Sequence, residues 1–242
     1  MAPMRDEEEE TLQLPSDTLA LLQAFQDEKL TREKQFEDLK LQAESDFEAT
    51  QDGKLSMDLF IEDWNTSQFW YTDATARILA RQLLEGAGVD SNIAVVSAPS
   101  VYIQLRNLLN EKPAATKPRL VLLEFDQRFS VFKQDFVSYD FAQPLKLPSE
   151  LKGRFDRVIC DPPFLSEDCQ TKTALTVRWL AKDWSSETKF ISCTGERMEA
   201  SITKLYSKLG VKTTTFEPEH SKGLSNEFRC YANFECEDWT WR

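Results

Sequence analysis

The residues best suited to chemistry form the tetrapeptide Asp161-Pro162-Pro163-Phe164, which directly follows residues 155–160, a run that is typical of a buried strand. The two prolines fix φ, remove two backbone donors and favour an extended conformation at Asp161, so its carboxylate and the next carbonyl oxygens stay available as acceptors. A substrate N–H is the natural donor. Because ligands of open α/β sheets bind outside the carboxyl ends of the strands, we interpret the tetrapeptide as part of an active site. The alternative is a rigid turn that ends the strand and places Phe164 in the core.

The tetrapeptide resembles the Asp/Asn-Pro-Pro-aromatic motif of S-adenosylmethionine-dependent methyltransferases that act on nitrogen. This resemblance implies that Asp161 and the carbonyl of Pro162 hold the amine with its lone pair toward the methyl group. It further implies that Pro163 stiffens the turn and that Phe164 stacks on the substrate. S-adenosylmethionine is the implied cofactor, and the substrate stays open at this point.

Short apolar runs alternate with helix-like stretches after residue 92, which predicts a mainly parallel sheet wrapped by helices. The last two expected strands are separated by a short loop, so we expect them to form an antiparallel hairpin. This order resembles the Rossmann-like, seven-stranded class I methyltransferase fold, an α/β architecture. The expected strands are 93–97, 120–123, 131–133, 155–160, 190–193, 211–215 and 228–234, and the expected helices are 72–84, 100–110, 171–182 and 196–209.

The amino-terminal part of the chain differs in charge from the rest. Residues 1–50 hold 14 acidic and five basic side chains, a net charge of −9 out of −12 for all 242 residues. We expect a disordered acidic tail at 1–15, a helical extension at 16–60 and the methyltransferase domain at 61–242. An acidic arm disfavours tight nucleic-acid binding and suits a basic protein partner, although Glu7 to Glu10 would equally suit a solvated tail.

Composition points to an intracellular protein without a metal. No apolar run approaches the ~20 residues that span a bilayer, and residues 1–10 lack a signal-peptide pattern, so we expect a soluble, cytoplasmic monomer. The five cysteines include no Cys-x-x-Cys pair, which favours reduced thiols. His220 is the only histidine, so a zinc site is not expected.

The first expected cofactor segment is Ser97-Ala98-Pro99-Ser100, directly after the first strand of the sheet. Many enzymes of this fold have a glycine-rich turn here, yet this chain has no glycine between Gly88 and Gly153. The hydroxyls of Ser97 and Ser100, with Pro99 between them, are the candidate replacements. A turn that merely caps the following helix is the alternative.

Two further acidic positions match those that bind the cofactor in this fold. Glu124 follows the second strand, where a fixed carboxylate suits a pair of ribose hydroxyls, and Asp126 is its rival for that role. The resemblance places an acid near the adenine amino group and an apolar ring beside the base at Asp135 and Phe136. A solvated acid at a strand end and a core phenylalanine are the simpler explanations.

A closer resemblance narrows the substrate to protein. The chain is similar to the eukaryotic lysine methyltransferase family that acts on translation elongation factor 1-alpha. This family was first grouped with adenine-DNA methyltransferases, and its glycine turn is replaced in the same way. The resemblance implies that Phe69, Trp70 and Tyr71 close over the cofactor or line the substrate entrance; the alternative is that Phe69 and Trp70 anchor the amino-terminal helices. The segments that carry it are 62–71, 92–102, 122–129, 134–141, 155–169 and 194–198.

Two other functions stay open. A nucleic-acid adenine methyltransferase would share Asp161 to Phe164, but the sequence lacks the basic, aromatic-interleaved segment that such a surface uses. A non-catalytic module that kept the fold and lost the cofactor would use the acidic extension as its working surface.

Overall fold

The computed structural model describes residues 23, 34, 55–57, 60, 68–223 and 227–242. The chain divides into a unit of residues 1–42 and a unit of residues 43–242. The expected acidic tail and nearly all of the expected helical extension lie outside the described residues, so those predictions stay predictions. The fold below is that of the second unit.

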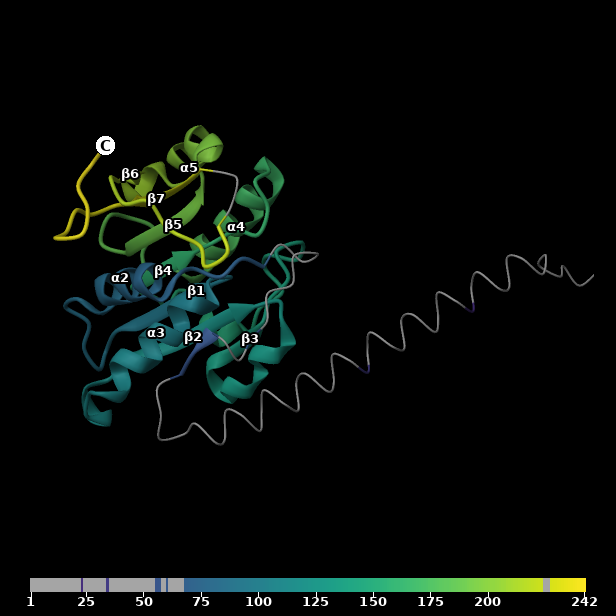
Figure 1. The fold of residues 1–242 in the computed structure, drawn as a ribbon, viewed down its shortest axis with the longest axis vertical. Helices are drawn as coiled ribbons and strands as arrows, with labels where there is room; N and C mark the ends of the chain where they lie inside the picture. The colour runs from purple at the N-terminus through teal and green to yellow at the C-terminus, as the bar shows by residue number, and fades with distance from the viewer. Residues whose placement is uncertain (1–22, 24–33, 35–54, 58–59, 61–67, 224–226) are drawn as a thin grey trace, which may run out of the picture. The chain divides into compact units, whose positions relative to one another are not determined.

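The described residues form a seven-stranded sheet in the order β3-β2-β1-β4-β5-β7-β6 (Figure 1). The strands β1 to β5 run parallel to one another, and β7 runs antiparallel between β5 and β6. The expected mainly parallel sheet and the expected antiparallel final pair are therefore confirmed. The strands are β1 (Asn92–Val96), β2 (Arg119–Glu124), β3 (Phe136–Ser138), β4 (Arg157–Cys160), β5 (Lys189–Gly195), β6 (Lys212–Thr213) and β7 (Phe228–Ala232).

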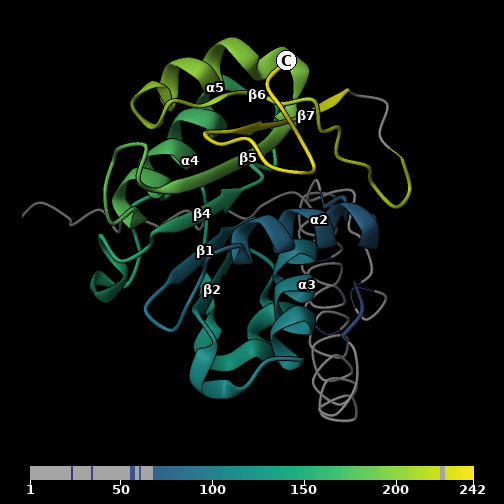
Figure 2. The same ribbon diagram turned by 90° about the vertical axis from the view of Figure 1, so that its left-hand side faces the viewer.

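Helices cover both faces of the sheet, and each face has its own apolar core (Figure 2). On one face lie α2 (Asp73–Leu84) and α3 (Pro99–Asn110), and on the other lie α4 (Glu167–Leu180) and α5 (Glu199–Leu205). Strands covered on both faces read as continuous apolar runs, as residues 93–96 do, and all four of these side chains are buried.

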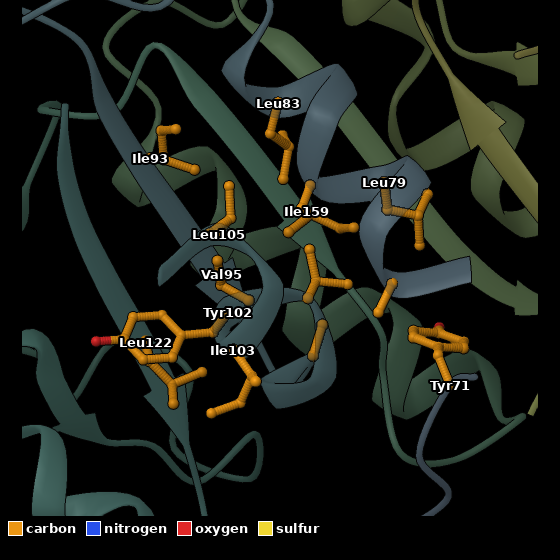
Figure 3. Packing of buried hydrophobic residues seen from close by; sticks show 14 of the residues in the cluster. Tyr71, Leu79, Leu83, Ile93, Val95, Tyr102, Ile103, Leu105, Leu122 and Ile159 are labelled. Carbon is orange, nitrogen blue, oxygen red and sulfur yellow. The ribbon is translucent and has the colours of Figure 1, made fainter. Parts of the chain in front are cut away.

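The core on the α2 and α3 face is a close packing of aliphatic side chains (Figure 3). Leu79 and Leu83 of α2 pack with Ile103 and Leu105 of α3 over Val95 of β1. These five residues are fully buried. Removing a buried leucine of this kind costs about 2–5 kcal/mol, so this layer holds the two helices firmly against the strands.

Two short pieces of the chain before residue 61 join the same core. Leu55 and Phe60 are 5% and 2% exposed. The side-chain amide of Asn107 accepts a hydrogen bond from the Leu55 N–H and donates one to the Leu55 carbonyl, both at 2.8 Å. Phe60 stacks on Phe129 with ring centroids 4.3 Å apart. These residues therefore belong to the packed domain although they precede its first expected position, residue 61.

The third expected strand was wrong by several positions. Residues 131–133 lie in the 3-10 segment Gln127–Asp135, and β3 begins only at Phe136. Asp126 caps this segment by accepting from the Arg128 N–H at 2.9 Å. The apolar residues Val131 and Phe132 are buried from a helical turn, so their pattern indicated burial and not strand.

Two expected helices also differ from the structure. The expected helix 171–182 begins earlier, at Glu167, because the Ser166 side chain caps it by accepting from the Cys169 N–H at 3.3 Å. The expected helix 196–209 consists of three short helices, Glu196–Met198, Glu199–Leu205 and Ser207–Leu209. The last two are separated at Tyr206, which leaves helical geometry at φ −105° and ψ 20°. Gly210 ends the last piece at φ 75°, a left-handed conformation that favours glycine.

Candidate functional site

A cavity of about 380 Å³ lies at the carboxyl ends of the parallel strands. Its size falls within the ~300–1,000 Å³ typical of small-molecule sites. Seven separate pieces of chain line it, and they include the motif, the serine turn and the aromatic segment that the sequence singled out. The lining residues are 68–71, 97–100, 124–125, 139–141, 161–164, His220 and Phe228.

The tetrapeptide follows β4, the middle strand of the sheet, at the edge where the parallel strands end. The Asp161 N–H donates to the Val96 carbonyl at 3.0 Å, which continues the β1–β4 ladder by one residue and fixes the start of the motif. The Tyr71 hydroxyl donates to Asp161 Oδ2 at 2.5 Å. Phe164 is 41% exposed, with its ring 5.5 Å from that of Phe141, so the alternative of a core phenylalanine was wrong.

Burial disfavours the charged form of Asp161 and Glu124, two of the three acids that line the cavity. It raises the pKa of Asp161 to about 8, where the hydrogen bond from Tyr71 acts in the lowering direction and the charge of Glu124 acts in the raising direction. Burial also raises the pKa of Glu124 to about 7, against the lowering effect of the backbone N–H groups of Asp126 and Phe125. Two carboxyls held in this way favour a ligand that carries positive charge, since a cation restores their ionised forms.

The turn after β1 replaces glycine with a strained serine. Ser97 has φ 54°, in the left-handed region that glycine adopts easily, and its N–H donates to the Leu123 carbonyl at 2.9 Å. The helix α3 begins at Pro99 without a side-chain cap, so the alternative of a serine cap was wrong. The hydroxyl of Ser100 instead accepts from the Tyr71 N–H at 3.2 Å. The serine turn therefore keeps the backbone geometry of a glycine turn.

The two rival acids after β2 occupy different environments. Glu124 lines the cavity, and its Oε1 accepts from the N–H groups of Phe125 at 2.9 Å and Asp126 at 3.1 Å. Asp126 is not among the lining residues. Its Oδ2 pairs with the Arg128 guanidinium at 2.5 Å and accepts from Gln68 Nε2 at 2.9 Å. Asp126 thus holds the loop together, and Glu124 is the acid that a ligand can reach.

Asp135 and Phe136 are also absent from the cavity lining. Asp135 Oδ2 pairs with Arg106 at 2.9 Å and accepts from the Tyr102 hydroxyl at 2.9 Å. These contacts hold it against α3. The acid that follows β3 into the cavity is Asp140. The misplaced third strand explains the difference, because it put the end of that strand several residues too early.

The three residues of the aromatic segment 69–71 all line the cavity, but they make different further contacts. Trp70 is 7% exposed, donates from Nε1 to the Phe60 carbonyl at 2.8 Å and meets Phe129 edge-on at 6.0 Å. It lines the cavity and also packs the segment against the core. The amino-terminal helices that it was alternatively expected to anchor lie outside the described residues. Phe69 lines the cavity, and Tyr71 lines it and contacts Asp161.

Sequence reasoning missed six lining residues: Phe125, Tyr139, Asp140, Phe141, His220 and Phe228. The first four lie within three residues after the end of β2 or β3, a position that could have singled them out. His220 and Phe228 come from the carboxyl-terminal part of the chain, and no spacing in the sequence indicates that they lie beside Tyr71. The ring of His220 is 4.8 Å from that of Tyr71 and 4.6 Å from that of Phe228.

The described parts of the chain contain no group of three or more His, Cys, Asp and Glu residues that could hold a metal ion. Among the same residues, no helix is long and apolar enough to cross a membrane.

The strand order and the cavity at the strand ends define the Rossmann-like methyltransferase fold. A solved structure supports this fold: the branched-chain polyamine synthase of Thermus thermophilus superimposes with a TM-score of 0.50 over 81% of this chain and 65% of that chain, at 12% identity.

Sequence comparison then narrows the class to a family. The family described as "Probable N6-adenine methyltransferase" matches residues 62–236. Protein-lysine N-methyltransferase EFM5 of Saccharomyces cerevisiae is 46% identical over 93% of both chains. Human EEF1A lysine methyltransferase 1 is 39% identical over 95% of both chains. The chain belongs to this family, whose named relatives are protein-lysine N-methyltransferases.

Proposed function

We propose that this protein transfers a methyl group from S-adenosylmethionine to a lysine of translation elongation factor 1-alpha. The observation that carries the proposal is Asp161, held by Tyr71 at the floor of a cavity that a cofactor and an amine could share. The names of the relatives supply the substrate: the human relative is an EEF1A lysine methyltransferase. Because elongation factors work in cytoplasmic translation, we propose the cytoplasm as the compartment.

The lining residues suit S-adenosylmethionine. The carboxylate of Glu124 is available for the two ribose hydroxyls, and Phe125, 60% exposed, offers a ring to the base. Asp140 is suited to the adenine amino group, the role that sequence reasoning gave to Asp135. The backbone of residues 97–100 offers close approach at the start of α3. The raised pKa values of Asp161 and Glu124 fit a ligand with a positive sulfonium.

The cofactor, when bound, supplies an electrophilic methyl group. A lysine amine has an ordinary pKa of about 10.4, so the protein must favour its neutral form. Burial in the cavity lowers an amine pKa, and Asp161 opposes this electrostatically but accepts from the nitrogen and orients its lone pair once the proton has left to water. The Pro162 carbonyl is a second acceptor. Phe164 packs on the lysine methylenes, and most of the acceleration comes from holding the two reactants in line.

An adenine methyltransferase acting on nucleic acid is the second candidate, since the family description names that activity. The net charge of −12 argues against it, because nucleic-acid binding depends on neutralising phosphates with Lys and Arg. The named relatives modify protein lysines, which also favours the first candidate.

Radiolabelled methyl transfer from S-adenosylmethionine to elongation factor 1-alpha tests the proposal, with total RNA and DNA as parallel substrates. We expect label on the protein only, at one lysine that mass spectrometry identifies. Asp161→Ala should lower the rate by about 10²–10⁴-fold while the circular dichroism spectrum stays unchanged. Asp168→Ala is the matched control, because Asp168 is an exposed acid of α4 outside the cavity lining. Label on nucleic acid, or an Asp161→Ala variant with full activity, would refute the proposal.

A further inference from the structure

Three aromatic rings form a continuous wall on one side of the cavity. Tyr71, His220 and Phe228 line it, with His220 between the other two at centroid distances of 4.8 and 4.6 Å. We call these residues the ring cluster. The ring of Phe228 meets that of His220 at an interplanar angle of 74°. The cofactor contacts proposed above use none of the three.

The strand order places Phe228, and with it His220, away from Glu124. Glu124 ends β2, and Asp161 follows β4, which lies on the other side of β1. Phe228 begins β7, which is farther along the same sheet beyond β5. Since β7 is antiparallel and Phe228 pairs with Gly195 at the end of β5, its start lies at the same edge as the ends of the parallel strands. Asp161 therefore stands between Glu124 on one side and the ring cluster on the other.

Backbone hydrogen bonds hold His220 in this place. The Thr72 N–H donates to the Glu219 carbonyl at 2.9 Å, and the Ser221 N–H donates to the Trp70 carbonyl at 2.8 Å. Tyr71 and His220 thus face each other in an isolated antiparallel bridge. These bonds fix the backbone on both sides of His220, so less ordering of the wall is needed when a ligand binds.

We propose that His220 determines specificity for the substrate lysine. It forms, with Tyr71 and Phe228, one wall of the channel by which the lysine side chain reaches Asp161, and it takes no part in binding the cofactor. Ring faces pack on the lysine methylenes and attract an amine that still carries its proton, so the wall favours a long cationic side chain. This inference rests on the proposed function and assigns the substrate side of the same cavity.

Two variants on opposite sides of Asp161 test the inference in the full-length protein. His220→Ala should raise the KM for elongation factor 1-alpha by about 5–20-fold and leave the Kd for S-adenosylmethionine, measured by calorimetry, within about twofold. Phe125→Ala should do the reverse, since Phe125 belongs to the cofactor side. His220→Phe keeps a ring in the wall and should restore the KM to within about threefold of the natural protein.

The outcomes separate this inference from the function on which it rests. If the natural protein binds S-adenosylmethionine but labels no elongation factor, the proposed function is wrong and the channel assignment falls with it. If the natural protein is active and His220→Ala has an unchanged KM, or weakens cofactor binding as much as Phe125→Ala does, the channel assignment alone is wrong. Should His220→Ala melt well below the natural protein, His220→Gln, which also removes the ring, replaces it, and an unchanged KM in that variant would overturn the assignment.

Discussion

The two sides of the cavity are built in different ways. On the side of β1, β2 and β3, the lining residues lie at the end of a strand or within four residues after it: Glu124 is the last residue of β2, and Asp140 comes two residues after the end of β3. On the side of β4 and β7, the walls come from segments far apart in the chain: Tyr71 contacts Asp161, 90 residues later, and His220 lies against both Tyr71 and Phe228.

Under the proposed function, this difference between the two sides matches the two ligands. Strand ends supply fixed carboxylates and backbone groups, which suit a cofactor of constant shape. The other side supplies aromatic rings around one acid, which suit a long side chain with an amine at its tip. We therefore expect variants on the first side to change cofactor affinity and variants on the second side to change methyl transfer.

Among the variants that test the difference between the two sides, Glu124→Gln is expected to have the largest effect on cofactor affinity. A neutral amide loses the charge-assisted hydrogen bonds to the ribose, worth about 1.5–3 kcal/mol, so the Kd for S-adenosylmethionine should rise about 10–100-fold in calorimetry. The KM for the protein substrate should change little.

Asp135→Asn is the control for that measurement, because Asp135 pairs with Arg106 and is not among the lining residues. We expect its cofactor affinity to stay within about threefold of the natural protein. A loss equal to that of Glu124→Gln would return Asp135 to the cofactor site and contradict the division proposed here.

A smaller effect is expected for Tyr71→Phe, which removes the hydroxyl that donates to Asp161. Without this hydrogen bond the Asp161 carboxyl is no longer held in one orientation. If the lost bond is worth ~1.5 kcal/mol in the transition state, kcat should fall about tenfold. The Kd for S-adenosylmethionine should hold, since the phenylalanine ring still fills the wall. A change in affinity with unchanged kcat would break the comparison, because it would move Tyr71 to the cofactor side.

The smallest effect concerns stability and pH. The pKa of Asp161 is about 8 in the folded protein and has an ordinary value of 3.8, so the folded state holds this proton more tightly than the unfolded chain. The resulting stability is fully present below about pH 4 and is lost as the pH rises through about 8. Asp161→Asn keeps a neutral side chain, so its Tm relative to the natural protein should rise by at least ~2–4 °C between pH 5 and pH 9. A difference in Tm that stays constant with pH would contradict the raised pKa.

Most elements were predictable because their signals are local. The runs that became β1, β2, β4 and β5 are covered by helices on both faces, and such burial leaves an unbroken apolar stretch in the sequence. The third strand was missed since Val131 and Phe132 are buried from a 3-10 turn, and apolar content alone does not separate that turn from a short strand. The break of the last long helix at Tyr206 likewise has no proline or glycine to announce it.

The sequence by itself determined the rigid, donor-poor backbone at Asp161 to Phe164, because two prolines constrain the chain wherever they stand, and it determined the α/β order from the spacing of apolar runs. Only the tertiary structure decided which acids face the cavity. Glu124 and Asp126 are two residues apart, yet Arg128 takes one into a buried ion pair and leaves the other for a ligand. It also decided that His220 lies against Tyr71, since contacts between distant segments follow from strand order and packing, which the linear spacing of residues does not record.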